Sequence, residues 1–358
     1  MPRKSATIRD VAKLAGVGVS TVSYVLNGND SHVSPATREQ IVAAARELNY
    51  RPNAIARSMV KQKTGTIGLI ITELQNPLFV PVTEGVEEIL RSDGYPILLV
   101  SANDVQSEIN AIELLRAQQV DGFIFMSLSI SYPTDHLVQL EADDMPFIII
   151  NRDLEPGLFN QIQFDDRGAG RLAAQHLLSL GHTHIAVLCG PCSDSLARSR
   201  RRSAVERYAG WCEVLNSHNL PVVSEWVLDG HYTYEGGYEA AQQLLALIRH
   251  SGEPPTALFV ANDMMAVGAL RAFAEGGLRI PEDLAVVTVG GTPLLEYTFP
   301  PLTTVQQPIA EAGRVAARLL VDWMKRGKPE PNQLVSLSFD LKIRTSCGAA
   351  STSSLKRV

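Results

Sequence analysis

The sequence of 358 residues lacks any long uncharged apolar run, and its strongest one, Met145 to Ile150, is only long enough for a β-strand. A membrane-spanning helix needs about 20 consecutive apolar residues, so a membrane span is excluded. The first residues are basic, but no apolar signal-peptide segment follows them, and we therefore expect a cytoplasmic protein. Four cysteines are too few for a disulfide framework in a chain of this length.

Charge is distributed unevenly along the chain. The whole sequence has a formal net charge of −6, but residues 1–63 contain ten Lys and Arg against four Asp and Glu, a net charge of +6. A basic N-terminal region joined to an acidic remainder is typical of a nucleic-acid-binding module attached to a second domain. Apolar residues make up 45% and charged residues 20% of the chain, so we expect two or three globular domains.

The N-terminal region has the apolar spacing of three short helices. Apolar residues recur every three or four positions after Thr7, a candidate N-cap, and Gly16 ends this first helix. A second helix begins near Val19 and ends at Asn27. A third begins at Ser34-Pro35, where Pro suits the first helical position. The first two helices fit the description of a helix-turn-helix.

The second of these helices exposes side chains that suit a DNA major groove. They are short or hydrogen-bonding, namely Val19, Ser20, Thr21, Ser23, Tyr24 and Asn27. A helical hairpin used only for dimerisation is the alternative, and the positive charge of this region weighs against it.

From residue 66 onward, short runs rich in Ile and Val alternate with amphipathic stretches. The strand candidates are residues 66–72, 95–101, 121–127, 145–151, 184–190, 256–263 and 284–290. Helical patterns lie between them, for example at 81–92, 106–118, 168–180 and 264–275. Strands that alternate with helices predict parallel sheets covered on both faces. Because the stretch is too long for one such sheet, we expect an α/β body of two Rossmann-like subdomains.

The order of these motifs resembles the lactose-repressor (LacI/GalR) family. The matching segments are TIRDVAKLAGVGVSTVSYVLNG and VSPATREQIVAAARELNYRPNAIARSM near the N-terminus, and HLLSLGHTHIAVLCGP, ALFVANDMMAVGAL and PPLTTVQQP further on. The resemblance covers residues 6 to about 345. It implies a dimeric, DNA-binding repressor with an all-α helix-turn-helix head and a body like that of periplasmic sugar-binding proteins.

The resemblance also implies a domain organisation. We expect a helix-turn-helix head at 1–52, a hinge at 53–63, an effector-binding body at 64–345 and a disordered tail at 346–358. Within the body, the first subdomain would comprise 64–165 and 307–324, and the second 166–306 and 325–345. The last ten residues contain one Leu and no leucine heptad, so a homodimer is expected and not a tetramer.

Further operator contacts are implied at the hinge. The candidates besides Thr7 are Asn53, Arg57 and Met59, and Met59 stands where the family usually has a Leu that wedges into the minor groove. A segment of eleven residues is too short to fold alone, and a solvated linker is the alternative. Tyr24 replaces the Arg or His that is common in the family, so a different operator sequence is expected.

In the body, the resemblance implies an effector site between the subdomains. Its candidate residues are aromatic or polar, namely Phe79, Asn151, Arg207, Tyr232, Asn262 and Gln307. Rings can stack on an apolar face and polar groups can bind hydroxyls, which fits a sugar or sugar derivative. An anionic effector is an open alternative, because Gly290 replaces an Asp of the family and an arginine-rich stretch lies at 198–202.

No nucleophile with its base and no His pair with metal-ligand spacing is recognisable, so we expect neither an enzyme, nor a cofactor, nor a metal site. Cys189-Gly190-Pro191-Cys192 has the spacing of a redox motif, but it falls on a Gly-Pro that the family carries at a strand end. The rival to the repressor hypothesis is a solute-binding protein without DNA function. The basic head and the missing signal segment count against that rival.

Overall fold

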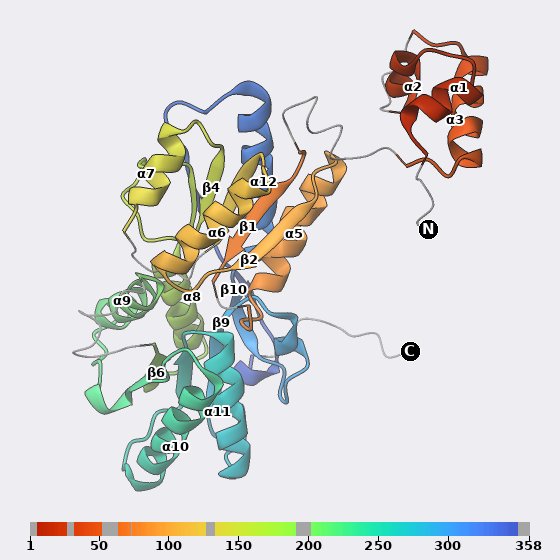
Figure 1. Cartoon of the computed structure of the whole chain (residues 1–358). Coiled ribbons are helices and arrows are strands. Elements are labelled where there is room, and N and C mark those ends of the chain that lie inside the picture. The colour runs from red at the N-terminus through yellow and green to blue at the C-terminus, as the bar shows by residue number, and fades with distance from the viewer. Residues whose placement is uncertain are drawn as a thin grey trace. The chain divides into compact units, whose positions relative to one another are not determined.

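The computed structural model of the protein describes residues 6–26, 32–51, 64–72, 74–126, 133–190 and 202–349 (Figure 1). The chain divides into two compact units, Met1–Gly65 and Thr66–Val358. Each unit has its own cluster of buried apolar side chains. Among the described residues, no helix combines the length and apolar content that crossing a bilayer requires.

The first unit contains the three predicted helices, α1 (Ile8–Leu14), α2 (Val19–Leu26) and α3 (Pro35–Glu47). The backbone N–H and the hydroxyl of Thr7 both donate to Asp10 Oδ2, at 2.8 and 2.7 Å, and fix the start of α1. Gly16 has a φ of 66°, which glycine adopts without a steric penalty, and the chain turns there into α2. The small core consists of Val11, Ala12, Val22, Val25, Ile41, Ala44 and Ala45.

The second unit contains two six-stranded sheets, one for each subdomain. The first sheet has the order β11-β5-β4-β3-β1-β2, with every neighbouring pair parallel. Its strands are β1 (Ile67–Ile71), β2 (Ile97–Ser101), β3 (Gly122–Met126), β4 (Phe147–Ile150), β5 (Gln161–Phe164) and β11 (Leu334–Leu337). Its helices are α5 (Phe79–Ser92), α6 (Val105–Ala117), α7 (Asp135–Ala142) and α12 (Ile309–Arg326). Helices α5 and α12 pack together, with α12 on β3 and β4, while α6 packs on β1 and β2.

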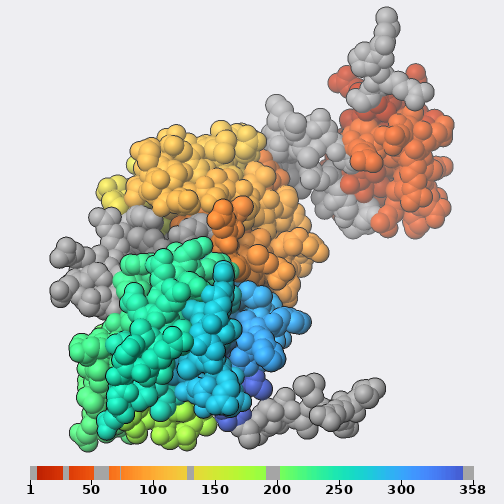
Figure 2. Space-filling view, turned by 90° about the horizontal axis from the view of Figure 1, so that it is seen from below, coloured from red at the N-terminus to blue at the C-terminus, as the bar shows by residue number. Residues whose placement is uncertain are grey.

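The second sheet has the order β12-β10-β9-β8-β6-β7 and is parallel except for the pair β10 and β12. Its strands are β6 (Ile185–Cys189), β7 (Val227–Asp229), β8 (Ala257–Val260), β9 (Ala285–Gly290), β10 (Thr303–Gln306) and β12 (Asp340–Lys342). Helices α8 (Asp166–Ser179) and α9 (Arg202–Ser217) pack as one pair, and α10 (Tyr234–His250) and α11 (Asp263–Glu275) as another. Figure 2 shows α10 and α11, in teal and cyan, covering one face of this subdomain.

The chain passes between the two subdomains three times. The first crossover follows β5 at Asp165, and the second follows β10 at Gln307. The third lies between β11 and β12, at residues 338–339. Three connections restrict the subdomains to rotating about one region, as in other hinged ligand-binding folds.

The predicted α/β body of two parallel-sheet subdomains is confirmed, and all seven strand candidates are strands. Two predicted boundaries are wrong. Residues 325–345 do not belong wholly to the second subdomain, because β11 pairs with β5 of the first sheet. Disorder from residue 346 is wrong for 346–349, since Ser346 is buried and its hydroxyl donates to the Val286 carbonyl at 2.7 Å. Residues 350–358 lie outside the described residues.

Glycines bring each of three helix pairs into close contact. A Cβ at Gly170 of α8 would lie 2.0 Å from the Arg207 carbonyl oxygen of α9, and one at Gly210 would lie 2.0 Å from the Arg167 carbonyl. Gly85 and Gly313 occupy the same kind of position between α5 and α12, as do Gly237 and Gly268 between α10 and α11. Backbone contact of this kind leaves no space for a side chain, so each helix pair is packed backbone against backbone.

We predict that Gly170→Ala destabilises the body, although alanine normally stabilises a helix relative to glycine by about 1 kcal/mol. The added methyl group meets backbone, which must shift, and overpacking of this kind costs about 1–3 kcal/mol. Urea denaturation would show a lower midpoint than for the wild type. The matched control is Gly252→Ala, where a Cβ meets nothing within 4 Å. Equal midpoints for the two variants would contradict the prediction.

Candidate functional site

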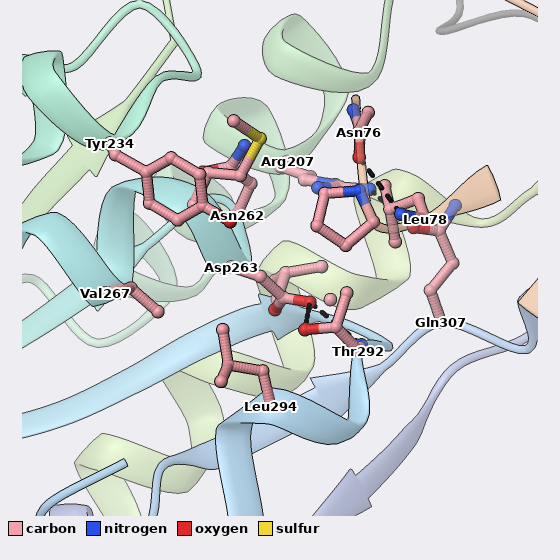
Figure 3. A pocket seen from close by; sticks show the side chains of 14 residues that line it. Asn76, Leu78, Arg207, Tyr234, Asn262, Asp263, Val267, Thr292, Leu294 and Gln307 are labelled. Carbon is pink, nitrogen blue, oxygen red and sulfur yellow. Dashed lines mark hydrogen bonds between the residues drawn. The ribbon is translucent and has the colours of Figure 1, made fainter. Parts of the chain in front are cut away.

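A small pocket lies at the carboxyl ends of β8 and β9, between the two subdomains (Figure 3). The first subdomain contributes Asn76, Pro77 and Leu78, the second crossover contributes Gln307, and the second subdomain contributes Arg207, Tyr234, Asn262, Asp263, Met264, Val267, Val289, Gly290, Thr292 and Leu294. Apolar walls with a few polar groups are typical of small-molecule sites. The free volume is about 20 Å³, room for about one water molecule. A larger ligand does not fit the cavity in this conformation.

The predicted effector residues are only partly brought together. Arg207, Asn262 and Gln307 line this pocket. Asn151 lines a second pocket of about 80 Å³, together with Arg152, Gln163, Phe164, Asp165, Asp166, Arg167, Arg202 and Glu206. Phe79 is buried in the apolar core and Tyr232 packs over Gly190, and neither side chain lines either of these two pockets.

The Arg207 side chain joins all three crossovers. Its Nε donates to Asp166 Oδ1 at 2.8 Å, next to the first crossover, and Nη2 donates to Gln307 Oε1 of the second crossover at 3.4 Å. The guanidinium carbon lies 5.8 Å from the ring centroid of Phe339, in the third crossover. Nη1 donates to the Ala261 carbonyl at 2.6 Å. The Arg207–Asp166 ion pair thus separates the two pockets, with one member lining each.

Seven described non-glycine residues have positive φ angles, among them Asn151, which lines the second pocket, and His231 and Tyr232, which follow β7. Asn151, His231 and Tyr232 have φ angles of 56°, 51° and 61°, a region that side-chain-bearing residues rarely adopt. The Tyr232 ring lies so close to Gly190 that a Cβ there would come within 1.8 Å of a ring carbon. Cys189 is buried in β6, and its partner in the C-x-x-C spacing, Cys192, lies outside the described residues.

Asp263 is a site residue that was not predicted from the sequence. Its Oδ2 accepts from the backbone N–H groups of Gly291 and Thr292, both at 3.0 Å, and from the Thr292 hydroxyl at 2.8 Å. A Cβ at Gly290 would lie 1.6 Å from Asp263 Oδ1, so a side chain at 290 and this carboxylate exclude each other. Burial raises the pKa of the Asp263 carboxyl in spite of these hydrogen bonds. The signal that could have revealed it is the unusual glycine at 290.

The charges around the pockets balance. Arg207, expected as a cationic anchor, is neutralised by Asp166, and Asp263 adds a further carboxylate. In the second pocket, Arg152 binds the buried Glu108. Arg202 alone of the arginine-rich stretch is described, and it lies 3.6 Å from Asp153. Arg198, Arg200 and Arg201 lie outside the described residues. The described part of the cleft thus has no excess of positive charge.

In the N-terminal unit, the predicted DNA-contacting side chains of α2 reach the surface to different extents. Tyr24 is 57% exposed, Val19 is 42% exposed and Ser20 is also exposed, whereas Thr21 and Ser23 are half-buried. Thr7 is exposed at the start of α1. Asn27, Asn53, Arg57 and Met59 lie outside the described residues, as does the whole of the predicted hinge at 53–63.

Comparison with known proteins shows which families the N-terminal unit and the body resemble. Residues 7–53 match the family described as bacterial regulatory proteins of the lacI family, and residues 174–347 match a periplasmic binding protein-like domain. The chain is 33% identical over 342 residues to the HTH-type transcriptional repressor PurR of Photobacterium profundum. The matched region covers 95% of this chain and 98% of that protein.

Solved structures agree with this relationship. One is a lac repressor dimer bound to operator and the anti-inducer ONPF, with a TM-score of 0.78, 30% identity and coverage of 96% of this chain and 99% of that one. Another is the complex of the transcriptional regulator CelR with cellobiose, with a TM-score of 0.69, 32% identity and coverage of 95% and 99%. The chain therefore belongs to the lacI family of bacterial regulatory proteins and is a DNA-binding transcriptional repressor, not an enzyme.

Proposed function

We propose that the protein acts as a homodimer on a two-fold symmetric operator and responds to a neutral, hydroxyl-bearing effector bound in the cleft between its subdomains. The observation that carries this proposal is the Arg207 side chain, which lines the pocket and also contacts all three crossovers. A ligand that enters beside Arg207 changes the groups on which subdomain closure depends.

The charges of the described residues support a neutral effector. An anion next to Arg207 would compete with Asp166 for the guanidinium and would lie near the carboxylate of Asp263. Like charges in a poorly solvated cleft repel strongly. Sugar hydroxyls can instead donate to carboxylates and accept from Asn262 or Asn76 without a net charge. The similar CelR structure contains cellobiose, a neutral sugar, which supports this choice.

Operator recognition is assigned to the exposed side chains of α2. Tyr24 and Ser20 can donate and accept hydrogen bonds at base edges, and Val19 can contact a thymine methyl group. A dimer presents two such helices, which calls for an operator with two-fold symmetry. The hinge contacts of Asn53, Arg57 and Met59, with Met59 as the minor-groove wedge, remain part of the proposal.

The effector would change operator affinity by changing the relative orientation of the two subdomains. Three glycine-packed helix pairs make the subdomains stiff, so a ligand in the cleft changes their relative orientation more readily than their internal structure. In a dimer, that rotation changes the separation of the two chains at residues 64–66, from which the hinge segments extend. The spacing of the two heads, and with it the operator affinity, then depends on the ligand.

A prediction about operator binding concerns Tyr24. An operator selected from a pool of random duplexes should be two-fold symmetric, and Tyr24→Ala should weaken binding to it by about 10- to 100-fold, the usual loss for one base contact. Fluorescence anisotropy measures the affinity, with an unrelated duplex of the same length as the control. Binding to that duplex should change little, because phosphate contacts supply nonspecific affinity. An equal loss on both duplexes would contradict a base-reading role.

Another prediction concerns the effector class. Thermal shifts would be compared for neutral sugars and for their phosphates, for example ribose with ribose 5-phosphate and glucose with glucose 6-phosphate. A ligand of the native state raises the melting temperature, and the neutral member of a pair should do so more strongly. Stronger stabilisation by the phosphates would show that the effector is anionic. Stabilisation by nucleobases alone would show that it is not a sugar.

A further inference from the structure

The two carboxylate oxygens of Asp263 have different surroundings. Oδ2 accepts three hydrogen bonds, from Gly291 and Thr292, whereas the buried Oδ1 has no hydrogen-bond partner among the described residues. Asp263 as a whole is only 6% exposed and forms part of the pocket wall (Figure 3). Buried carboxylate oxygens are normally satisfied, so an orphan one at a pocket wall indicates a missing donor.

Oδ1 is shielded from solvent in this conformation, but no side chain at position 290 covers it. Gly290 has no side chain, and any Cβ at that position would overlap the Asp263 carboxylate. Gly291 and Thr292 hold the other oxygen, so the carboxylate is fixed in orientation. The neighbouring side chains in the pocket wall, Val267 and Leu294, offer no donor.

We propose that Asp263 Oδ1 accepts a hydrogen bond from a hydroxyl group of the effector and thereby selects ligands that carry a donor at that position. Asp263 then serves two purposes, since one oxygen fixes the loop that follows β9 and the other binds the ligand. The proposal deepens the assignment of a neutral, hydroxyl-bearing effector and rests on it.

If Asp263 only fixed the loop after β9, Asp263→Asn would leave the affinity for the ligand unchanged. If Oδ1 binds the ligand, the same variant loses affinity although the loop stays in place. An asparagine can turn its oxygen towards Gly291 and Thr292 and keep the loop in place, but its NH₂ group then points where Oδ1 was, and donor meets donor. Burial raises the pKa of the Asp263 carboxyl, so ionising it costs the folded protein free energy that a neutral side chain at this position avoids. The variant without ligand should therefore melt at the same temperature as the wild type or higher.

The test uses the full chain and three probes, namely ribose, glucose and cellobiose. For the probe that stabilises the wild type most, Asp263→Asn should lower the affinity by about 10- to 100-fold, as the loss of a charge-assisted hydrogen bond predicts. The matched control is Asp104→Asn, since Asp104 also accepts at a helix N-terminus, from Ser107 N–H at 2.8 Å, but lies outside the pocket. The control should bind the probe as the wild type does.

Analogues of the same sugar test the proposal without a variant. Fluorine in place of a hydroxyl cannot donate, so one deoxyfluoro analogue should bind the wild type about 10- to 100-fold more weakly than its parent sugar. Unchanged affinity for Asp263→Asn, or for every deoxyfluoro analogue, would overturn the role of Asp263 and leave the effector site intact. If none of the three probes stabilises the wild type, the proposed effector class fails, and this inference fails with it.

Discussion

The buried guanidinium group of Arg207 is the constraint on which the arrangement of the body depends. It lies where the chain passes three times between two sheets, and it contacts a residue at each passage, Asp166, Gln307 and Phe339. A buried charge must keep its partners, because removing one of them leaves the other charge unpaired in a poorly solvated site. The positions of the two subdomains are therefore linked to the surroundings of one side chain, and that side chain is also part of the pocket wall.

Close packing inside the subdomains makes the contacts of Arg207 matter for their relative orientation. Gly170 and Gly210 hold α8 and α9 in backbone contact, and α9 carries Arg207. A force on Arg207 is therefore passed to the helix pair as a whole, because close-packed helices do not deform locally. If the helices were loosely packed, a change at Arg207 would shift side chains within one subdomain and leave the orientation of the two subdomains unchanged. The small volume of the pocket fits this view, since a closed cleft has to open before a sugar can enter.

Much of the fold could be predicted from the sequence because its signals are local. The alternation of Ile- and Val-rich runs with amphipathic stretches predicts the central strands, and Ser34-Pro35 predicts the start of α3. Strands β5, β7, β10, β11 and β12 were not predicted; β5 and β12, for example, contain polar residues such as Gln161 and Asp340 and lack a long apolar run. β11 was assigned to the wrong subdomain, because only pairing with β5 reveals its sheet.

The candidate site was harder to predict because its features depend on contacts between distant segments. Arg207 was predicted as a ligand contact, but its ion pair with Asp166 and its contact with Phe339 join residues far apart in the chain. The importance of Asp263 follows from a position 27 residues later, Gly290, whose missing side chain makes room for it. Sequence spacing alone contains neither relation.

The most direct test of the account measures how strongly the cleft and the operator are coupled. Operator affinity would be measured with and without a saturating concentration of the sugar that stabilises the protein most, for the wild type and for the double variant Asp166→Asn/Arg207→Gln. The double variant removes both charges together and leaves neither buried alone. The account predicts a change of about 5- to 150-fold in the wild type and a change close to onefold in the variant. A variant that binds operator and ligand and retains the coupling of the wild type would contradict the central role of Arg207.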